Sequence, residues 1–233
     1  KFNSKSQTFL NMINGIINFA PFFIIASVIY LFILSHRQVQ PINNSIINFT
    51  GNPHTEYAFA TFTTPAFCMG AIVLGHSLIK SHGNKYDRIC LVSPDVNETW
   101  VRILSQWWTV VRVRNFKPSP GFRRSWAKLY LWDLTSYKKI VYMDTDMIAI
   151  KNLDELFKYP QLSCVPDPAP PQICNSGVLV LEPKPGLTKL LMKTSKTTSL
   201  IQGIGDQSFI NSFFGKFTPL PPYYSIPRTQ GGS

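Results

Sequence analysis

The stretch "IVYMDTDMIAI" places two aspartates, Asp144 and Asp146, one residue apart directly after a run of apolar residues. Along an extended strand these side chains would project together, with Cβ atoms about 6 to 7 Å apart. Two such carboxylates would repel each other, and a divalent cation that prefers oxygen ligands would remove the conflict. The pair predicts a Mn²⁺ or Mg²⁺ site rather than zinc, because the histidines and cysteines show no ligand spacing. The tripeptide alone leaves open that both aspartates only cap a turn before "NLDELF".

The elements that must position this pair alternate in type. Strand-like and helical patterns follow one another from residue 57 onward, which is typical of a mostly parallel α/β sheet covered by helices on both faces. The expected strands are residues 57–63, 88–93, 109–116 and 138–144, and the expected helices are residues 66–83, 97–108 and 125–137. Ligands gather at the carboxyl ends of such strands, which is where the aspartate pair would lie.

Basic residues outnumber acidic ones by 23 to 12, a net charge of +11. This excess suggests a nucleic-acid or membrane-surface partner, but the basic residues are scattered, without a basic helix or zinc-finger spacing. We therefore expect no nucleic-acid partner. The length allows one sizeable domain plus an appendage, and because the chain starts at Lys1 rather than Met we expect a piece of a longer protein.

The amino-terminal segment is apolar enough to cross a membrane. No charged residue occurs from Ser6 to Ser35, and about twenty such residues span a bilayer. A cleaved signal peptide is the alternative, but no small-residue cleavage site follows promptly. We expect a cytoplasmic tail (residues 1–11), a transmembrane signal anchor (12–35), a polar stem (36–54) and a catalytic-size domain (55–233).

Three N-glycosylation sequons follow the predicted anchor, at Asn43, Asn48 and Asn97. Each could occur by chance, but all three lie where a lumenal domain would carry acceptor sites. They favour a single-pass type II protein of the secretory pathway.

Four motifs in order carry a resemblance to a known family. The stretch "AKLYLWDLTSYKKIVYMDTDMIAIKNLDELF", followed by "CNSGVLVLEP" and "GDQSFINSFF", resembles glycosyltransferase family 8, the family of glycogenin and of plant xylan glucuronosyltransferases. The resemblance runs from about Tyr57 to Phe214 and includes "TTPAFCMGAIVLGHSL" near its start. It implies a Rossmann-like nucleotide-diphospho-sugar transferase fold, a UDP-sugar donor, and a glycan or polysaccharide acceptor.

The resemblance also implies a role for each matching residue. Asp144 and Asp146 would hold Mn²⁺, or alternatively Mg²⁺, against the donor phosphates. The expected catalytic residues are Asp206, which would bind sugar hydroxyls, and Gln207, which would lie near the anomeric carbon. Further donor contacts are implied for Phe62, Thr63 and Thr64 at uracil and ribose, Arg123 or Arg124 at the diphosphate or a sugar acid, Lys128 at the donor, Thr145 between the aspartates, and Asn175, Ser176 and Gly177 along the donor sugar. For the arginines, a solvated basic helix start is the alternative.

The sequence departs from the family pattern in two places. Pro65 stands where a polar residue is usual, and Phe67 stands at a tyrosine-like position, so uracil stacking is retained and a hydroxyl contact is not. The family usually supplies a third metal ligand and a lysine from an H-x-x-G-x-x-K segment, whereas no histidine follows His82. We expect a fragment truncated before that segment, rather than a protein that has lost part of its donor site.

The predicted function is that of a Golgi membrane-anchored, metal-dependent, retaining glycosyltransferase that moves glucuronate or glucose from a UDP-sugar to a glycan hydroxyl. The metal and Lys128 would stabilise charge growing on the leaving phosphate. The anchor, the sequons and "YPQLS" favour the plant-like branch over a glycogenin-like glucosyltransferase that primes a glucan. A non-catalytic glycan-binding or partner-binding relative is the other alternative, and a homodimer is compatible with the sequence.

The four cysteines allow three disulfide connectivities. Cys164 and Cys174 flank "VPDPAPPQI" and could pair, whereas Cys68 and Cys90 are expected to be buried free thiols. The sequence alone does not decide whether any bridge forms.

Overall fold

The computed structural model describes residues 53–114, 124–168, 172–197 and 205–225 of the chain. The predicted cytoplasmic tail, the predicted anchor and the predicted stem up to residue 52 lie outside the described residues. Within the described ranges, no helix is both long enough and apolar enough to span a membrane.

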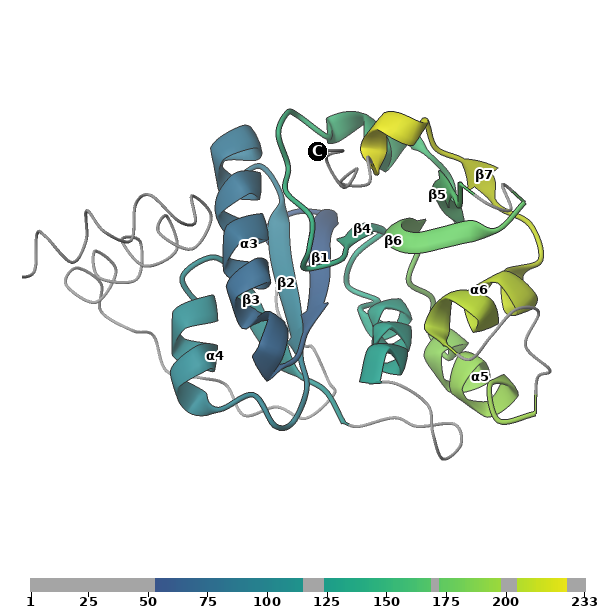
Figure 1. Ribbon diagram of the computed structural model, residues 1–233, viewed down its shortest axis with the longest axis horizontal. Coiled ribbons are helices and arrows are strands. Elements are labelled where there is room, and N and C mark those ends of the chain that lie inside the picture. The colour runs from purple at the N-terminus through teal and green to yellow at the C-terminus, as the bar shows by residue number, and fades with distance from the viewer. Residues whose placement is uncertain (1–52, 115–123, 169–171, 198–204, 226–233) are drawn as a thin grey trace, which may run out of the picture. The chain divides into compact units, whose positions relative to one another are not determined.

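A seven-stranded sheet lies at the centre of the described part, in the order β3-β2-β1-β4-β6-β5-β7 (Figure 1). The strands are β1 (Tyr57–Thr63), β2 (Asp87–Val92), β3 (Thr109–Arg112), β4 (Lys139–Met143), β5 (Ser163–Pro166), β6 (Cys174–Leu181) and β7 (Thr218–Pro219). The first four strands are parallel, as predicted, but β6 is antiparallel to both β4 and β5. Because β5 is also antiparallel to β6, and β7 is parallel to β5, every described strand except β6 runs in the same direction. The sheet is therefore mostly parallel, as predicted, with β6 as its antiparallel strand.

Connection length accounts for this change of direction. The first four strands are joined by segments that contain helices, as a parallel crossover requires. β5 and β6 are joined by residues 167–173 alone, which is too short for a crossover and long enough for an antiparallel return.

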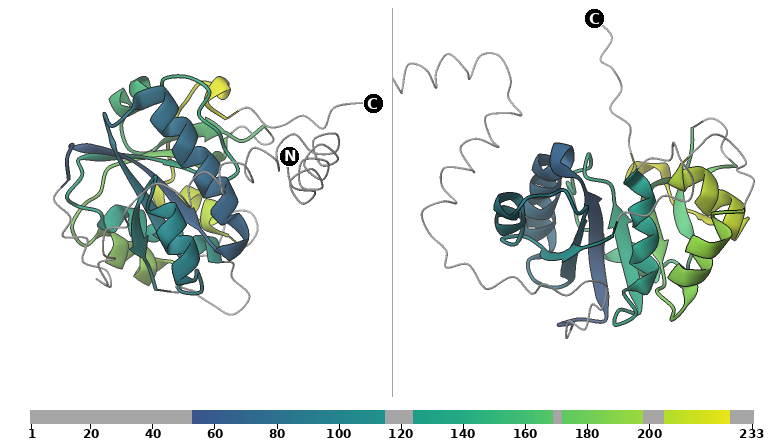
Figure 2. Two further views of the ribbon diagram at one scale, coloured as in Figure 1. Left: turned by 90° about the vertical axis from the view of Figure 1, so that its left-hand side faces the viewer. Right: turned by 90° about the horizontal axis from the view of Figure 1, so that it is seen from below.

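Helices cover both faces of the sheet (Figures 1 and 2). Helices α3 (Cys68–His82) and α4 (Glu98–Leu104) lie on one face, and η2 (Arg124–Asp133), α5 (Leu187–Thr194) and α6 (Asp206–Phe214) lie on the other. Three short 3₁₀ helices complete the described elements: η1 (Pro65–Phe67), η3 (Asp154–Lys158) and η4 (Pro222–Tyr224).

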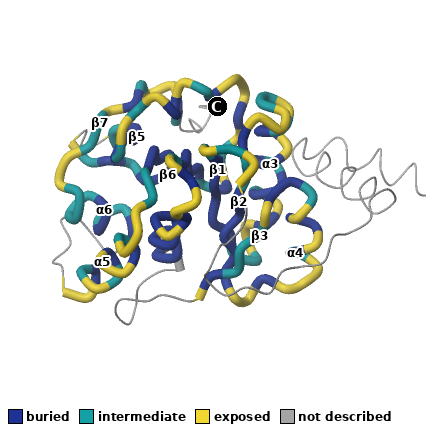
Figure 3. The backbone as a smooth tube through the Cα atoms, turned by 180° about the vertical axis from the view of Figure 1, so that it is seen from behind, coloured by how far each residue is buried: buried dark blue, intermediate teal, exposed yellow. Residues whose placement is uncertain are grey.

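The alternation of side chains along β1 explains why both faces are covered. The Phe59 ring lies 4.9 Å from the His82 ring of α3, while Ala58 and Ala60 belong to a core cluster with Trp126 of η2 on the other side. Nearly all of β1 is buried, as the tube in Figure 3 shows. A strand covered on both faces is expected to be mostly apolar, and β1 is apolar except for Thr61 and Thr63, which are also buried.

Two predicted helices differ from the observed ones. α4 ends at Leu104 rather than at residue 108, because the chain turns to bury Trp107 and Trp108, and the Trp108 indole donates to Ala71 O of α3 at 2.9 Å. The segment from Arg124 is a 3₁₀ helix rather than an α-helix.

Candidate active site

The D-x-D pair lies on a tight turn at the carboxyl end of β4. Met147 N donates to Asp144 O at 3.2 Å, so the chain turns directly after the strand. The expectation of an extended D-x-D segment is therefore wrong: both aspartates lie on the turn. Bonds to the neighbouring strands fix where the turn begins, since Asp144 N donates to Gly177 O at 2.9 Å and Thr61 Oγ1 donates to Met143 O at 2.8 Å.

The start of the "NLDELF" segment is contacted by a side chain of its own, that of Asn152. Asp154 N donates to Asn152 Oδ1 at 2.8 Å. Among the described residues, no bond joins that segment to the carboxylate of Asp144 or Asp146, so the contacts do not support a capping role for the pair.

Lys128 of η2 connects the turn to α6. Its side chain is buried, and Nζ lies 3.0 Å from Asp144 Oδ1 and 2.9 Å from Asp206 Oδ2. Nζ also donates to Ser176 O at 3.3 Å and lies 5.0 Å from the centre of the Tyr142 ring. Side chains from η2, β4, β6 and α6 thus meet around one buried ammonium group.

Burial and charge act in opposite directions on this cluster. Burial alone would lower the pKa of Lys128, but the carboxylates of Asp206 and Asp144 outweigh it, and the pKa lies above its usual value. Burial raises the pKa of Asp144, although Lys128 partly offsets the increase. Lys128 therefore remains charged at neutral pH, and keeping Asp144 ionised costs free energy.

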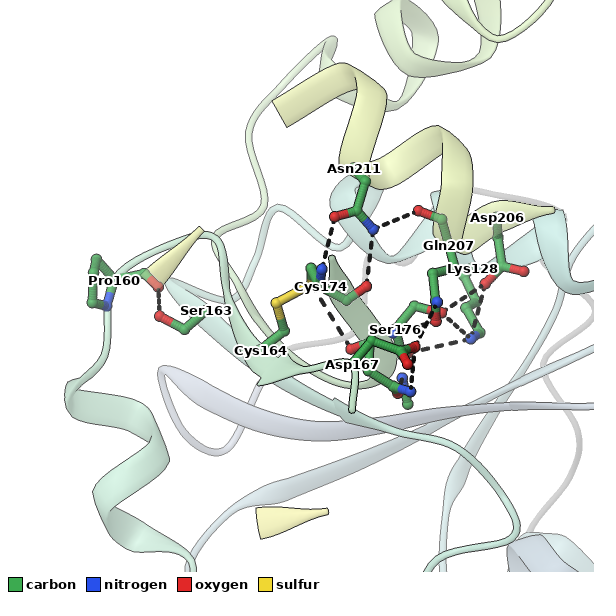
Figure 4. The surroundings of a disulfide bond; sticks show 12 residues. Lys128, Pro160, Ser163, Cys164, Asp167, Cys174, Ser176, Asp206, Gln207 and Asn211 are labelled. Carbon is green, nitrogen blue, oxygen red and sulfur yellow. Dashed lines mark hydrogen bonds and ion pairs between the residues drawn. A yellow bond between two sulfur atoms is a disulfide. The ribbon is translucent and has the colours of Figure 1, made fainter. Parts of the chain in front are cut away.

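The start of α6 lies against the start of β6 (Figure 4). Ser176 Oγ donates to Asp206 Oδ2 at 3.3 Å, and Ser176 N donates to Gln207 Oε1 at 3.0 Å. The other end of the Gln207 amide donates to Asp167 Oδ2 at 3.1 Å, and Asn175 Nδ2 lies 3.5 Å from the same oxygen. Both expected catalytic residues are thus fixed by the β5–β6 hairpin.

Two glycines allow the backbone to approach the D-x-D turn closely. A Cβ on Gly70 of α3 would stand 2.2 Å from Thr145 O, a distance that no real Cβ adopts. A Cβ on Gly177 would stand 3.0 Å from Asn175 Oδ1 and 3.5 Å from Asp144 Oδ2. Gly70 lets the turn pack directly on the helix, and Gly177 leaves space beside a carboxylate.

The segment expected at uracil and ribose is mostly buried. Phe62 and Thr63 are buried, and the Thr63 hydroxyl donates to Thr64 O at 3.2 Å. Phe67 is 56% exposed, so it is the aromatic ring of this segment that solvent can reach. Arg123 lies outside the described residues, and nothing is described of the Arg124 side chain at the start of η2.

The carboxylates present fit a hard divalent cation in part. Asp144 Oδ1 is engaged by Lys128 and Tyr142, while Oδ2 lies on the side left open by Gly177, and Asp146 is exposed. Carboxylate oxygens are donors that Mn²⁺ and Mg²⁺ accept. Among the described residues, no group of three or more His, Cys, Asp or Glu side chains is gathered as a metal site. A cation at this turn would need ligands in addition to these two carboxylates.

Two polar residues of the site were not predicted from the sequence. Asp167 lies in a proline-rich connection without periodicity, and no signal marks it. Asn211 lies four residues after Gln207, so helical spacing could have placed the two on one face of α6. The Asn211 side chain bonds the backbone of Cys174, and not the side chains of the residues expected to contact the UDP-sugar.

The four cysteines comprise one disulfide pair and two free thiols, an arrangement that the sequence allowed. Cys164 and Cys174 form a disulfide between β5 and β6, and Cys68 and Cys90 are free and buried, as expected. Burial raises the pKa of the Cys68 thiol to about 11, so this thiol is protonated at neutral pH.

Comparisons with known proteins find relatives that are similar in sequence and a solved structure that is similar in fold. No family model matches the chain. Glycogenin-2 of Homo sapiens is 33% identical over 185 residues, covering 74% of this chain and 36% of glycogenin-2. Inositol phosphorylceramide glucuronosyltransferase 1 of Arabidopsis thaliana is 33% identical over 174 residues, covering 72% of this chain and 32% of that protein. The chain spans 36% to 52% of the lengths of the mammalian glycogenins that it matches.

The crystal structure of the glycosyltransferase GlyE from Streptococcus pneumoniae TIGR4 is similar in fold. It aligns with a TM-score of 0.56 and 20% identity, over 72% of this chain and 46% of that one. At this identity the similarity concerns the fold alone.

Proposed function

The chain belongs to glycosyltransferase family 8, the family of the glycogenins and of plant glucuronosyltransferases, and we propose that it transfers glucuronate or glucose from a UDP-sugar to a glycan hydroxyl. The observation that carries the proposal is the ion cluster at the D-x-D turn, in which the buried ammonium of Lys128 pairs with buried Asp206 and half-buried Asp144. Removing these charges from water is costly, and a protein that required only stability would gain little from it. Charged groups with perturbed pKa values gather at functional sites.

In the proposed reaction, the bond between the anomeric carbon and the β-phosphate oxygen of the donor breaks. The acceptor oxygen bonds to that carbon on the same face, so that configuration is retained, and the acceptor proton passes to the leaving phosphate. Asp206 would accept hydrogen bonds from the sugar hydroxyls, and Gln207 would lie at the anomeric carbon. Their contacts with Ser176 hold both side chains in place before the donor arrives.

The leaving diphosphate would lie at the D-x-D turn. Asp144 and Asp146 would hold Mn²⁺ or Mg²⁺, which when bound would offset negative charge developing on the diphosphate. Lys128 keeps the Asp144 carboxylate oriented and places a fixed positive charge beside it. An exposed ring at Phe67 is available to stack on uracil.

We also propose that residues 12–35 anchor a single-pass type II protein in the Golgi membrane, with residues 55–233 in the lumen. The uncharged segment and the three sequons support this location, and Asn97 is exposed at the start of α4. A disulfide between Cys164 and Cys174 fits an oxidising compartment.

The direct test incubates the chain with Mn²⁺ and a panel of UDP-sugars, with and without oligosaccharide acceptors, and follows UDP release. We expect release with one donor and its loss in Asp206→Asn. Lys85→Ala is the matched control. Lys85 is half exposed, pairs with Asp154, and lies after the carboxyl end of α3, whereas Gly70 lies at the amino end. Loss of the Lys85 side chain should therefore leave the rate of UDP release unchanged. No release with any combination of donor and acceptor would contradict the proposal and favour a non-catalytic binding relative.

A further inference from the structure

The start of β6 is held from two sides at Cys174 (Figure 4). The disulfide with Cys164 joins it to β5. From α6, Asn211 bonds both backbone groups of Cys174: Cys174 N donates to Asn211 Oδ1 at 2.8 Å, and Asn211 Nδ2 donates to Cys174 O at 2.9 Å. The side-chain amide thus replaces the hydrogen bonds of a neighbouring strand. We call Cys164, Cys174 and Asn211 the Cys174 clamp.

The same hairpin and the same helix turn hold the carboxamide of Gln207. Its two ends bond to Ser176 N and to Asp167 Oδ2, at 3.0 and 3.1 Å. Ser176 and Asp167 follow the two bridged cysteines by two and three residues. Asn211 Nδ2 also donates to Gln207 O at 2.9 Å. Each contact that orients this amide is therefore made close to the clamp.

Backbone pairing alone holds this end of the hairpin weakly. The register between β5 and β6 shifts between Cys164 and Pro166, and Pro166 has no N–H to donate. Beyond Pro166, among the described residues, a backbone bond from Asp167 N to Ile173 O at 2.7 Å links the two strand ends. The disulfide and Asn211 supply the fixation that the strand pairing lacks.

We propose that the Cys174 clamp is a positioning device for sugar transfer. It holds Gln207 against Ser176 and Asp167, and through the Ser176 hydroxyl it sets Asp206 relative to Lys128. This inference rests on the proposed function. Because the expected uracil contacts lie at the end of β1, which the clamp does not touch, loss of the clamp lowers the transfer rate more than the affinity for UDP.

Two changes in the full chain test the clamp independently. The double variant Cys164→Ala/Cys174→Ala removes the bridge. Asn211→Asp keeps the acceptor oxygen and the shape, but loses the amide donor and places a carboxylate beside two carbonyl oxygens. We expect kcat to fall about tenfold to a hundredfold in each, because misplacement by about 1 Å can cost that much. The Kd for UDP with Mn²⁺ should change by less than about threefold, which separates positioning from binding.

The controls match the kind of change. Cys90→Ala removes a buried free thiol from β2, and Ser212→Ala removes a side-chain hydrogen bond from α6; both should keep the parent kcat. The disulfide and Asn211 both hold Cys174. The triple variant Cys164→Ala/Cys174→Ala/Asn211→Asp should therefore have a kcat only slightly below that of the more impaired of the two separate variants. Additive losses would show that they act separately and would overturn the clamp.

A readout that needs no activity keeps the two proposals apart. The Ser176 amide donates to Gln207 Oε1, so its hydrogen exchange in labelled protein reports whether Gln207 is in place. Faster exchange in both clamp variants supports the clamp, and exchange equal to that of the parent overturns it. If the parent chain transfers no sugar, the proposed function fails, while the exchange of this amide still decides the clamp. If the double variant Cys164→Ala/Cys174→Ala had the kcat of the parent and the same exchange rate at the Ser176 amide, the proposed role of the clamp would be refuted.

Discussion

At the scale of single residues, Asp144 illustrates a conflict between function and stability: the proposed metal site needs an ionised carboxylate, whereas burial disfavours that charge. Burial raises its pKa, so its contribution to folding stability is fully present below the unfolded value of 3.8 and is lost as the pH rises through the folded value. At neutral pH the ionised carboxylate is therefore a cost. A neutral side chain of the same shape avoids that cost.

Asp144→Asn should consequently weaken Mn²⁺-dependent UDP binding without lowering the free energy of unfolding at pH 7. We expect a binding loss of about 1.5 to 3 kcal/mol, typical of a charge-assisted contact, measured by calorimetry. Urea unfolding should give equal or higher stability than the parent at pH 7, with the difference shrinking towards pH 4. Asp146→Asn provides the comparison: Asp146 is exposed, so binding should fall without a change in stability. Unchanged UDP binding in both variants would reject the metal site.

Gly70 positions the D-x-D turn through its missing side chain. Glycine to alanine within a helix normally stabilises by up to about 1 kcal/mol. At Gly70 the added Cβ would stand 2.2 Å from Thr145 O, so the turn must move. Gly70→Ala should therefore destabilise by about 1 to 3 kcal/mol, as overpacking does, and weaken UDP binding as well.

Gly75 offers a matched control in the same helix. A Cβ there would meet Trp108 Nε1 at 2.5 Å and Trp107 Cβ at 2.8 Å, a comparable conflict away from the turn. Gly75→Ala should destabilise by a similar amount and leave UDP affinity unchanged. If both variants affected UDP binding equally, Gly70 would have no specific positioning role.

Much of the candidate site could be predicted from motifs, and part of it could not. The resemblance grouped Lys128, Asp144, Ser176 and Asp206, and these side chains are in contact, although their donor roles stay predictions. Asp167 could not be found, because its path through a proline-rich connection follows no period. Its partner Gln207 lies 40 residues later, a distance over which spacing carries no information.

At the scale of elements, the segment after the D-x-D turn runs along α3. Ala149 N donates to Ser77 Oγ at 3.0 Å, and Leu153 N donates to His82 Nε2 at 2.8 Å. The His82 side chain is 2% exposed, and burial lowers its pKa below 6.5, although Asp154 partly opposes this. The neutral ring is therefore the form that fixes the end of this segment.

The pH dependence of stability should reveal this contact. Since the folded pKa is lowered, the contribution of His82 is present above pH 6.5 and is lost as the pH falls through the folded value. The slope is at most about 1.4 kcal/mol per pH unit. His82→Gln should be less stable at pH 7.5 and show a flatter profile down to pH 5 in urea unfolding.

His76 supplies the control for this experiment. It lies exposed on the same helix, so His76→Gln should reproduce the parent profile. Parallel profiles for the parent and His82→Gln would contradict a neutral, hydrogen-bonded His82.

The elements themselves were predictable where each one carries a full pattern. The first four strands and the helix over α3 follow from alternation and from a stop at Gly83, where φ is +58°. The antiparallel return of β6 was not predicted, because it depends on the short connection after Pro166 rather than on any periodicity. The early end of α4 depends on tertiary burial of Trp107 and Trp108, which overrides the helical pattern.

At the scale of the whole molecule, the ion cluster forms only when η2, β4, β6 and α6 are all in place. A ligand at this cluster should therefore stabilise the entire domain. We expect UDP with Mn²⁺ at 100 times its Kd to add about 2.7 kcal/mol to the unfolding free energy, and EDTA to cancel the gain. Thermal unfolding with UDP alone, Mn²⁺ alone and both together measures this, and a gain that survives EDTA would argue against the metal.

The sequons test where the protein resides, and one of them can be tested without disturbing the fold. Asn97 caps α4: its Oδ1 accepts from Trp100 N at 3.0 Å, while the residue is exposed for a glycan on Nδ2. In a eukaryotic secretory host we expect an endoglycosidase-sensitive mobility shift and resistance to carbonate extraction. Asn97→Gln would remove both sequon and cap, at about 1 kcal/mol of stability, whereas Thr99→Ala removes the sequon alone. Both should lose the same glycan, with only Asn97→Gln less stable. An unglycosylated product, or one secreted freely, would overturn the lumenal anchor.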